Sequence, residues 1–189
     1  MITDNALAND HEEIIERSRM YEAFAAAFRG SVDHNEVGLL SIAFPEDTPE
    51  SRADYLNAFD CSVSSAACSL HGADYTSQER TSLFQDLVQF FEFFGVKRRD
   101  GAELPDHISV ELEFLHYLTF CQLKGLEQDH NISGLLRAER DLLDRHVIPL
   151  AEHLKKGCKL HISYYVELTQ KFVNYVKLQH NNLDAVVST

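Results

Sequence analysis

The chain has 189 residues, of which 44% are hydrophobic, so it is long enough to bury one sizeable core. Asp and Glu (30) outnumber Lys and Arg (17), which gives a formal net charge of −13 at pH 7. Nucleic acid is therefore not an expected partner, because binding phosphates requires a basic face. No apolar run is long enough to cross a bilayer, so we expect no stable membrane association. Residues 1–10 lack the basic start and apolar core of a secretory signal, which predicts a cytoplasmic protein.

The four cysteines are Cys61, Cys68, Cys121 and Cys158, and no two of them form a C-x-x-C pair. Neither a zinc ribbon nor a redox dithiol is indicated by this spacing. A cytosolic chain of this size does not need disulfides, so we expect four free thiols, mostly buried.

Helical periodicity dominates the chain and no strand alternation is sustained, which predicts one all-α domain over residues 1–189. The first helix is expected over residues 11–28, with Gly30 as its C-cap. A short helical piece is expected over residues 39–44. The sequence Thr48-Pro49-Glu50-Ser51 is typical of a helix start and leads to Phe59.

Residues 61–74 are rich in Ser, Ala and Gly and are expected to form an ordered loop. The following sequence, Thr76-Ser77-Gln78-Glu79, matches a capping box. It opens a phenylalanine-rich helix over residues 83–94 whose apolar side chains cover most of its circumference. We therefore expect this helix to be central. If Phe90 or Phe93 were exposed, it would instead offer an apolar groove.

A charged turn then leads into Pro105-Asp106-His107 and a helix that we expect to end at Lys124, with Gly125 as its stop. Proline suits a first turn, and Asp106 can cap the helix and stabilise its positive end. His107 and Glu111 stand four residues apart, where side chains on a helix can touch. A capping aspartate with an ordinary i,i+4 pair, or a binding site, would both fit this pattern.

The C-terminal third is predicted to form two more helices. The first covers residues 135–146 and is bent or ended near Pro149, and the second covers residues 162–180. The charged residues of the first of these helices, Glu139 to Arg145, are expected to form a solvated face crossed by ion pairs. Residues 1–10 and 181–189 are expected to be frayed.

Glu113-Phe114-Leu115-His116 has the E-x-x-H spacing that di-iron bundles use twice, and residues 127–130 repeat it formally. The second copy lies in a polar stretch, and no further carboxylates stand at matching positions. A helical metal protein or enzyme using Glu113 and His116 is therefore the alternative interpretation rather than the main one. No metal, cofactor or catalytic residue is predicted, since no nucleophile, phosphate-loop or zinc-protease motif occurs.

The chain resembles the TorD/DmsD/NarJ family of redox-enzyme maturation chaperones from about residue 15 to 175. The resemblance is most specific at Pro105-Asp106-His107, and it is closest to the subgroup serving type II enzymes of the dimethyl sulfoxide reductase family. The subgroup tends to show Cys-Pro-Leu-Tyr where this chain has Cys68-Ser69-Leu70-His71. The other segments that carry the resemblance are Tyr55–Asp60, Leu87–Val96 and Leu136–His146.

This resemblance implies a TorD-like helical bundle that is not an enzyme. Its partner would be the precursor catalytic subunit of a molybdoenzyme, including its twin-arginine signal peptide. The chaperone would assist cofactor insertion and delay export, as a monomer or a dimer. The implied peptide-binding residues are Pro105, Asp106, His107 and Glu111, with Leu70, His71 and Tyr75 from the preceding loop. For those three loop residues, an anchoring role in the core is the alternative.

Overall fold

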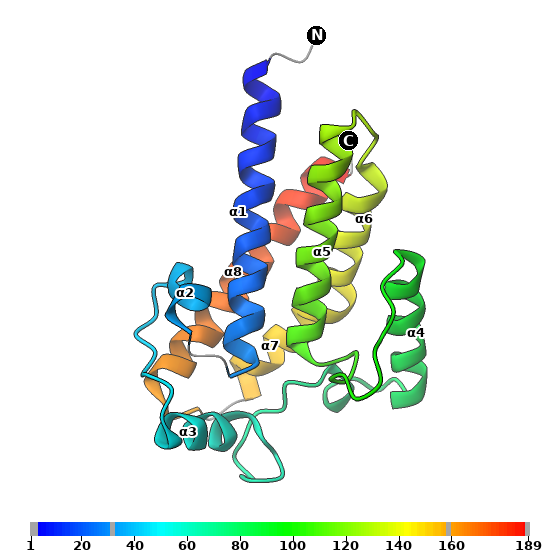
Figure 1. Ribbon diagram of the computed structural model, residues 1–189. Coiled ribbons are helices and arrows are strands. Elements are labelled where there is room, and N and C mark those ends of the chain that lie inside the picture. Colours follow the sequence, from blue (N-terminus) through cyan, green and yellow to red (C-terminus); the bar gives the residue numbers. More distant parts are fainter. Residues whose placement is uncertain (1–3, 31–32, 158–159, 188–189) are drawn as a thin grey trace.

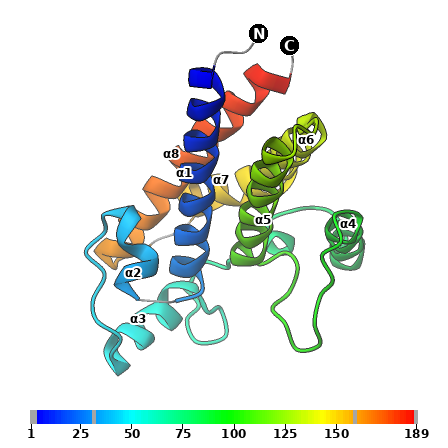
Figure 2. The same cartoon turned by 45° about the horizontal axis from the view of Figure 1, so that its top comes forward.

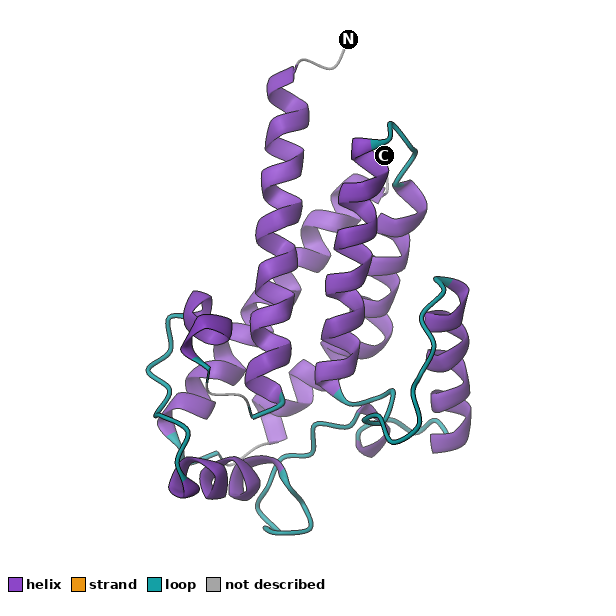
Figure 3. Ribbon diagram, viewed as in Figure 1, coloured by secondary structure: helices purple, strands orange, loops and turns teal. Residues whose placement is uncertain are grey.

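The computed structural model describes residues 4–30, 33–157 and 160–187 (Figure 1). Within these ranges the chain is helical and contains no strand, which confirms the all-α prediction (Figure 3). Three short non-α helical segments occur at Gly38–Leu40, Gly72–Asp74 and Leu143–Val147. The α-helices are α1 (Asp4–Phe28), α2 (His34–Val37), α3 (Pro49–Phe59), α4 (Arg80–Phe93), α5 (Ile108–Glu127), α6 (Ser133–Leu142), α7 (Ile148–Gly157) and α8 (Ser163–Val187).

Helices α1 and α5 pack along each other, α6 lies beside α5, and α8 contacts α6 and α7 (Figures 1 and 2). Helix α3 lies across the lower end of this bundle, and α4 stands at its edge, beyond α5. None of the described helices has the length and apolar character needed to cross a membrane.

Aromatic side chains form the core between α1 and α8. The Phe172 ring lies 5.0 Å from Phe28 and 5.4 Å from Phe24, centroid to centroid, and all three are fully buried. Tyr165, also on α8, lies 4.9 Å from Phe59 of α3. Burying one such side chain contributes about 1.5–3 kcal/mol. This cluster therefore ties both ends of the chain and α3 into one core.

Both predicted frayed segments extend long helices. Helix α1 begins at Asp4, and α8 continues to Val187 with Leu183 only 2% exposed. Residues 1–3 and 188–189 lie outside the described residues, and fraying of the chain ends stays a prediction. The predicted end of the first helix is confirmed: Gly30 has φ +78°, the left-handed conformation of a C-cap glycine.

The short helix predicted over residues 39–44 is displaced. Helical structure instead covers residues 34–40, because Asp33 caps it by accepting from the Asn35 N–H, and residues 41–46 are extended or irregular. The start of α3 is confirmed. Thr48 and Ser51 form the capping box, with each side chain accepting from the other residue's backbone N–H.

Helix α4 is peripheral, which corrects the prediction of a central helix. Only Leu83, Leu87 and Phe91 are buried along it, and Phe93 is 82% exposed. The predicted capping box at Thr76 is also wrong, since the helix begins at Arg80 and Glu79 is itself the N-cap, accepting from the Ser82 N–H. The apolar residues surround α4, but α4 has a neighbour on one side only.

Two helices run past the residues expected to end them. Helix α5 continues through Gly125 to Glu127, and a Cβ at Gly125 would come within 2.6 Å of the Ile132 side chain. The glycine is thus required by close packing of the α5–α6 turn. Pro149 lies inside α7, directly after a π-helical turn at Leu143–Val147. Such a turn accommodates the hydrogen bond that proline cannot donate, so the helix continues.

The prediction of four free thiols is only partly confirmed. Cys61 and Cys121 are free, with Cys61 exposed and Cys121 half-buried. Cys68 is disulfide-bonded, so the expectation is wrong for this residue. Cys158 lies outside the described residues.

Candidate functional site

The loop before α4 docks on the start of α5. An isolated antiparallel bridge joins His71 to His107. The Gly72 N–H donates to the Asp106 carbonyl at 2.9 Å, and the Ile108 N–H donates to the Leu70 carbonyl at 2.9 Å. Two segments more than 30 residues apart in the sequence are thus joined by their backbones, and most of the predicted site residues lie at this junction.

Asp106 lies at the centre of the junction and is completely buried. Its Oδ1 lies 3.1 Å from His71 Nδ1, and its Oδ2 accepts from the Ala73 N–H at 3.0 Å. Burial raises the pKa of Asp106, but the hydrogen bonds from His71 and Ala73 outweigh it and lower the pKa overall. Asp106 is therefore an ionised group that holds the loop; it does not cap α5.

His107 is the residue that caps α5. Its Nδ1 accepts from the Ser109 N–H at 3.2 Å and lies 2.8 Å from the Ser109 hydroxyl. Burial and the nearby His71 ring lower the pKa of His107 to about 4. The imidazole is thus neutral at physiological pH, with its proton on Nε2. A neutral histidine can serve as the cap because its free ring nitrogen is an acceptor.

Glu111 is 1% exposed, one turn into α5. Burial, and to a smaller extent the charge of Asp106, raise its pKa well above the usual 4.5. Its Oε2 has no hydrogen-bond partner among the described residues, and no ion pair joins it to His107 there. The predicted i,i+4 pair is therefore absent, because Glu111 lies under the docked loop, close to Gly72.

Leu70 and Tyr75 anchor the loop. Leu70 is 2% exposed, and the Tyr75 hydroxyl donates to the Ser69 carbonyl at 2.7 Å. The Tyr75 ring also stacks on His153 of α7, with the ring centroids 4.1 Å apart. Both side chains therefore hold the loop to the bundle, which is the alternative that the sequence left open.

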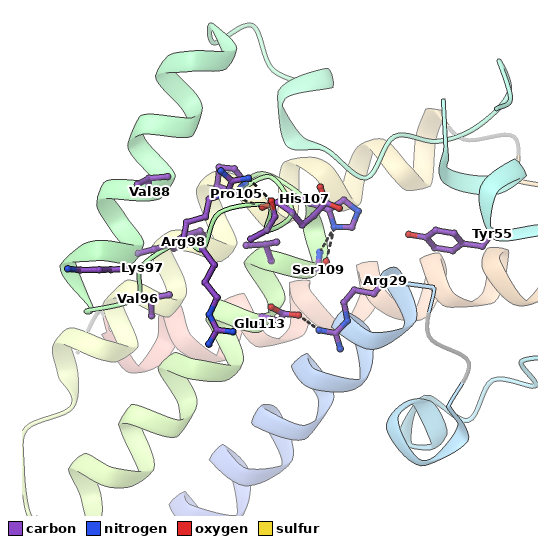
Figure 4. Close-up of a pocket in the computed structure, with 15 residues that line it drawn as sticks. Arg29, Tyr55, Val88, Val96, Lys97, Arg98, Pro105, His107, Ser109 and Glu113 are labelled. Atoms are coloured by element: carbon purple, nitrogen blue, oxygen red, sulfur yellow. Dashed lines mark hydrogen bonds and ion pairs between the residues drawn. The ribbon is translucent and has the colours of Figure 1, made fainter. Parts of the chain in front are cut away.

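A cleft of about 590 Å³ opens between α4, α5 and the ends of α1 and α3. We call it the large cleft. Figure 4 shows Val88 of α4 and Tyr55 of α3 on opposite sides, with Pro105, His107 and Ser109 between them. Its charged lining includes an ion pair between Arg29 and Glu113. The lining also includes the apolar Phe91, Val96 and Val110, the basic Lys97, Arg98 and Arg99, and the acidic Glu103.

A second cavity of about 330 Å³ adjoins the large cleft and shares Tyr55, Glu103 and His107 with it. We call it the acidic pocket, because Asp60, Asp74 and Glu103 all line it. Asp60 accepts from the Ser62 N–H and hydroxyl, which lowers its pKa, so this carboxylate stays ionised. An acidic cavity therefore lies directly beside a larger, more apolar one.

The predicted residues divide clearly between lining and support. Pro105 and His107 line the large cleft, while Leu70, His71 and His107 line the acidic pocket. The remaining three, Asp106, Glu111 and Tyr75, line neither cavity, and they contact the loop before α4 and hold it in place. Four residues that line these cavities were not predicted from the sequence: Tyr55, Asp60, Asp74 and Glu103. Tyr55 and Asp60 are the two ends of a segment that carries the family resemblance, and Asp74 and Glu103 lie close to two other such segments.

Comparison with known proteins identifies the family. The model of the nitrate reductase delta subunit family matches residues 22–156, well over half of the chain. The chain belongs to this family. This match, together with the relatives described next, confirms the predicted family of redox-enzyme maturation chaperones.

Three curated relatives are named as assembly chaperones. The selenate reductase assembly chaperone protein of Thauera selenatis is 32% identical over 70% of this chain and 68% of its own length. The chlorate reductase assembly chaperone protein of Ideonella dechloratans is 34% identical over 59% of this chain and 58% of its own. The perchlorate reductase assembly chaperone protein of Dechloromonas aromatica (strain RCB) is 29% identical over 64% and 57%. These names describe chaperones and not catalysts, which confirms the non-enzymatic prediction.

Glu113 and His116, the residues of the alternative metal-site interpretation, have other partners in the structure. Glu113 pairs with Arg29, and His116 Nδ1 lies 3.1 Å from the Ser18 carbonyl, to which it donates. The second E-x-x-H copy lies largely in the exposed turn after α5. In the described part of the chain no three His, Cys, Asp or Glu residues are grouped to hold a metal ion. The geometry therefore does not favour this interpretation.

The His71–Asp106 contact predicts a pH-dependent stability. The hydrogen bond from His71 to Asp106 raises the pKa of His71 above its usual 6.5, although partial burial opposes the shift. The contact therefore stabilises the fold fully below pH 6.5, and this contribution is lost as pH rises through the raised folded pKa. We expect His71→Gln to reduce the free energy of unfolding more at about pH 6 than at about pH 8.5. Urea titrations of both proteins measure this, and a pH-independent difference would contradict it.

Proposed function

We propose that this chaperone binds the precursor catalytic subunit of a molybdenum-containing oxidoreductase in the cytoplasm. The observation that carries the proposal is the set of relatives named as assembly chaperones of selenate, chlorate and perchlorate reductases. The client would be a reductase of this type, held while its molybdenum cofactor is inserted. The chaperone needs no cofactor of its own for this role.

The twin-arginine leader of the client would lie in the groove formed by the acidic pocket and the large cleft. Two adjacent guanidinium groups are well matched to carboxylates, which can bind each of them through paired hydrogen bonds. The acidic pocket supplies Asp60 and Glu103, whereas its third carboxylate, Asp74, is already paired with Arg80. Asp106 and Glu111 are too deeply buried to do this, so we assign them a positioning role: they hold the loop that forms the pocket wall.

The apolar stretch of the leader would occupy the large cleft. Val88, Phe91, Val96, Pro105 and Val110 line it from α4, the following loop and α5. Extended peptides and helices are commonly recognised through spaced apolar anchors in a groove of this kind. The peripheral position of α4 supports this arrangement, because a helix with one neighbour can leave apolar residues available to a ligand.

Delayed export follows from mass action. A leader bound to the chaperone is not free to engage the translocase, so the fraction available falls as chaperone concentration exceeds its dissociation constant. Cofactor insertion and folding of the catalytic subunit would weaken the hold and release the leader. Binding and release of the leader would therefore set the time of export, without any chemical step by the chaperone.

Co-purification tests the partner. The tagged chain is expressed in its native host under anaerobic growth, and the bound proteins are identified by mass spectrometry. The expected result is a precursor molybdoenzyme subunit with its leader intact. Recovery of the mature, leader-free subunit alone, or of no reductase, would overturn the proposal.

A pair of variants tests the groove. Asp60→Asn with Glu103→Gln removes two charges from the acidic pocket, and a hydrogen bond to a charged group contributes about 1.5–3 kcal/mol. We therefore expect the synthetic leader peptide of the co-purified client to bind at least about tenfold more weakly, by fluorescence anisotropy. Glu46→Gln with Glu50→Gln is the matched control, since both residues are exposed and line neither cavity. Equal affinity in the two double variants would remove the acidic pocket from the mechanism.

A further inference from the structure

A further groove, of about 600 Å³, lies at the opposite end of the bundle from the large cleft and the acidic pocket. Its walls are the N-terminal half of α1, the α5–α6 turn and the C-terminal half of α8. Figures 1 and 2 both place these three segments at the end where the termini lie, far from the loop that leads into α5. We call it the terminal groove. It shares no lining residue with the large cleft or the acidic pocket.

The terminal groove has an apolar wall that the fold leaves uncovered. Leu178 and Val186 line it from α8 and are 55% and 61% exposed. With Asn182 they form a row at four-residue intervals along the helix. Leu126 and Leu136 face them from the α5–α6 side and are half-buried. A spaced row opposite a second apolar wall is the shape that accepts the apolar face of a helix.

The charges on the rim of the terminal groove indicate which charge a bound partner would carry. Glu13 and Glu16 line the groove from α1, three residues apart on one side of the helix, and both are exposed. In the described part of the chain neither carboxylate has an ion-pair partner. Arg17, the basic lining residue, is already paired with the buried Glu139, 2.8 Å from its Nε. The charge that the rim offers to a partner is therefore negative.

A polar group without a hydrogen-bond partner among the described residues lies at the floor of the terminal groove. The Tyr175 hydroxyl is buried and has no hydrogen-bond partner among the described residues. Buried polar groups are normally paired, so an unpaired one beside a groove marks a place for a ligand group. A lysine ammonium has three donors, and it could donate to Tyr175 and Glu16 together.

We propose that the terminal groove docks a cationic amphipathic helix of a partner protein. A second copy of this chain does not fit, because a two-fold interface would bring Glu13 and Glu16 towards another acidic rim. An anionic lipid surface is opposed by the same charges. This docking does not depend on leader binding, since the terminal groove lies at the other end of the bundle and shares no lining residue with the large cleft or the acidic pocket.

Two synthetic peptides test the proposal. Both are about 18 residues long and carry leucine at every third or fourth position, and their other residues are mainly lysine in one and glutamate in the other. Fluorescence anisotropy with the full chain is expected to show saturable binding of the lysine peptide only. Leu178→Asp with Val186→Asp is expected to weaken it at least tenfold. Leu39→Asp is the matched control, because Leu39 is also 55% exposed but lies outside the groove.

Charge reversal makes the test sharper. Glu13→Lys with Glu16→Lys is expected to weaken the lysine peptide and to strengthen the glutamate peptide. Equal binding of both peptides, or lysine-peptide affinity that survives Leu178→Asp with Val186→Asp, would overturn the proposal. A dimer in sedimentation that these aspartates dissociate would overturn it in favour of self-association, and chain-dependent binding to anionic vesicles would do so in favour of a membrane.

The same variants separate this inference from the proposed function. Asp60→Asn with Glu103→Gln is expected to leave binding of the lysine peptide unchanged, and Leu178→Asp with Val186→Asp to leave leader binding unchanged. If the groove aspartates abolish leader binding, the leader lies in the terminal groove and both assignments are overturned. If Asp60→Asn with Glu103→Gln leaves leader binding unchanged while the other expected results hold, only the assignment of the leader to the acidic pocket and the large cleft is overturned.

Discussion

Replacing Glu139 with alanine is expected to lower the free energy of unfolding by about 3–5 kcal/mol, because it leaves a buried cation without its partner. Glu139 is fully buried on α6 and accepts from the Tyr21 hydroxyl at 2.9 Å and from Gln122 Nε2 at 2.7 Å. Arg17 Nε lies 2.8 Å away. Removing the carboxylate therefore takes one interaction from each of three polar side chains in the interior of the bundle, although Arg17 still donates to Gln122 Oε1 at 2.8 Å.

The measurement is urea unfolding followed by far-UV circular dichroism, with a thermal scan in which Tm falls by on the order of 10 °C. Asp141→Ala is the matched control on the same helix, because Asp141 pairs with Arg140 at the surface, where such a pair contributes at most about 1 kcal/mol. If the two alanine variants were equally stable, the buried network would not hold α1 to α6. Burial raises the pKa of Glu139, and Arg17, Gln122 and Tyr21 offset part of this shift.

Replacing Asp106 with alanine is expected to cost about 2–3 kcal/mol of stability and to weaken leader binding together with it. The carboxylate accepts from the part-buried backbone N–H of Ala73 and from His71, so its removal leaves two donors unpaired. The loop that forms one wall of the acidic pocket would then be held only by its backbone hydrogen bonds and by the anchors Leu70 and Tyr75. We expect the leader affinity to fall at least about tenfold, because the pocket must be re-formed when the peptide binds.

Asp106→Asn separates position from charge. The amide oxygen can still accept from the Ala73 N–H, so this variant is expected to retain most of the stability and most of the leader affinity. If Asp106→Asn were as defective in binding as Asp106→Ala while remaining stable, a direct charge contact with the leader would be indicated. That outcome would contradict the positioning role that full burial of Asp106 implies.

The helices themselves were largely predictable because their signals are local. The capping box at Thr48 and Ser51, the C-cap glycine at position 30 and the apolar periodicity of α5 depend on residues only a few positions apart. The errors occurred where a neighbour distant in sequence decides the outcome. Gly125 does not end α5, because the Ile132 side chain requires a residue without a Cβ there.

The structure brings together most of the residues that the resemblance assigned to peptide binding, and their role in binding stays a prediction. Pro105-Asp106-His107 lies at a junction with the loop at Leu70 and His71. Full burial of Asp106 was not predictable from the sequence, because its partners His71 and Ala73 lie more than 30 residues away and reach it only when that loop docks. Glu139 shows the same effect in the core, where Arg17 and Tyr21 come from the other end of the chain.

The sequence alone determined the fold class, the positions of most helices and the family, because these depend on periodicity, on capping and on motifs contained in short segments. The tertiary structure decided which apolar helix faces are covered, which carboxylates are buried and where the grooves lie. The physical reason is that burial and electrostatic environment are set by pairs of residues far apart in sequence. Periodicity shows that a face is apolar, but it does not show whether a neighbouring element covers that face, as Phe93 on α4 and Leu178 on α8 demonstrate.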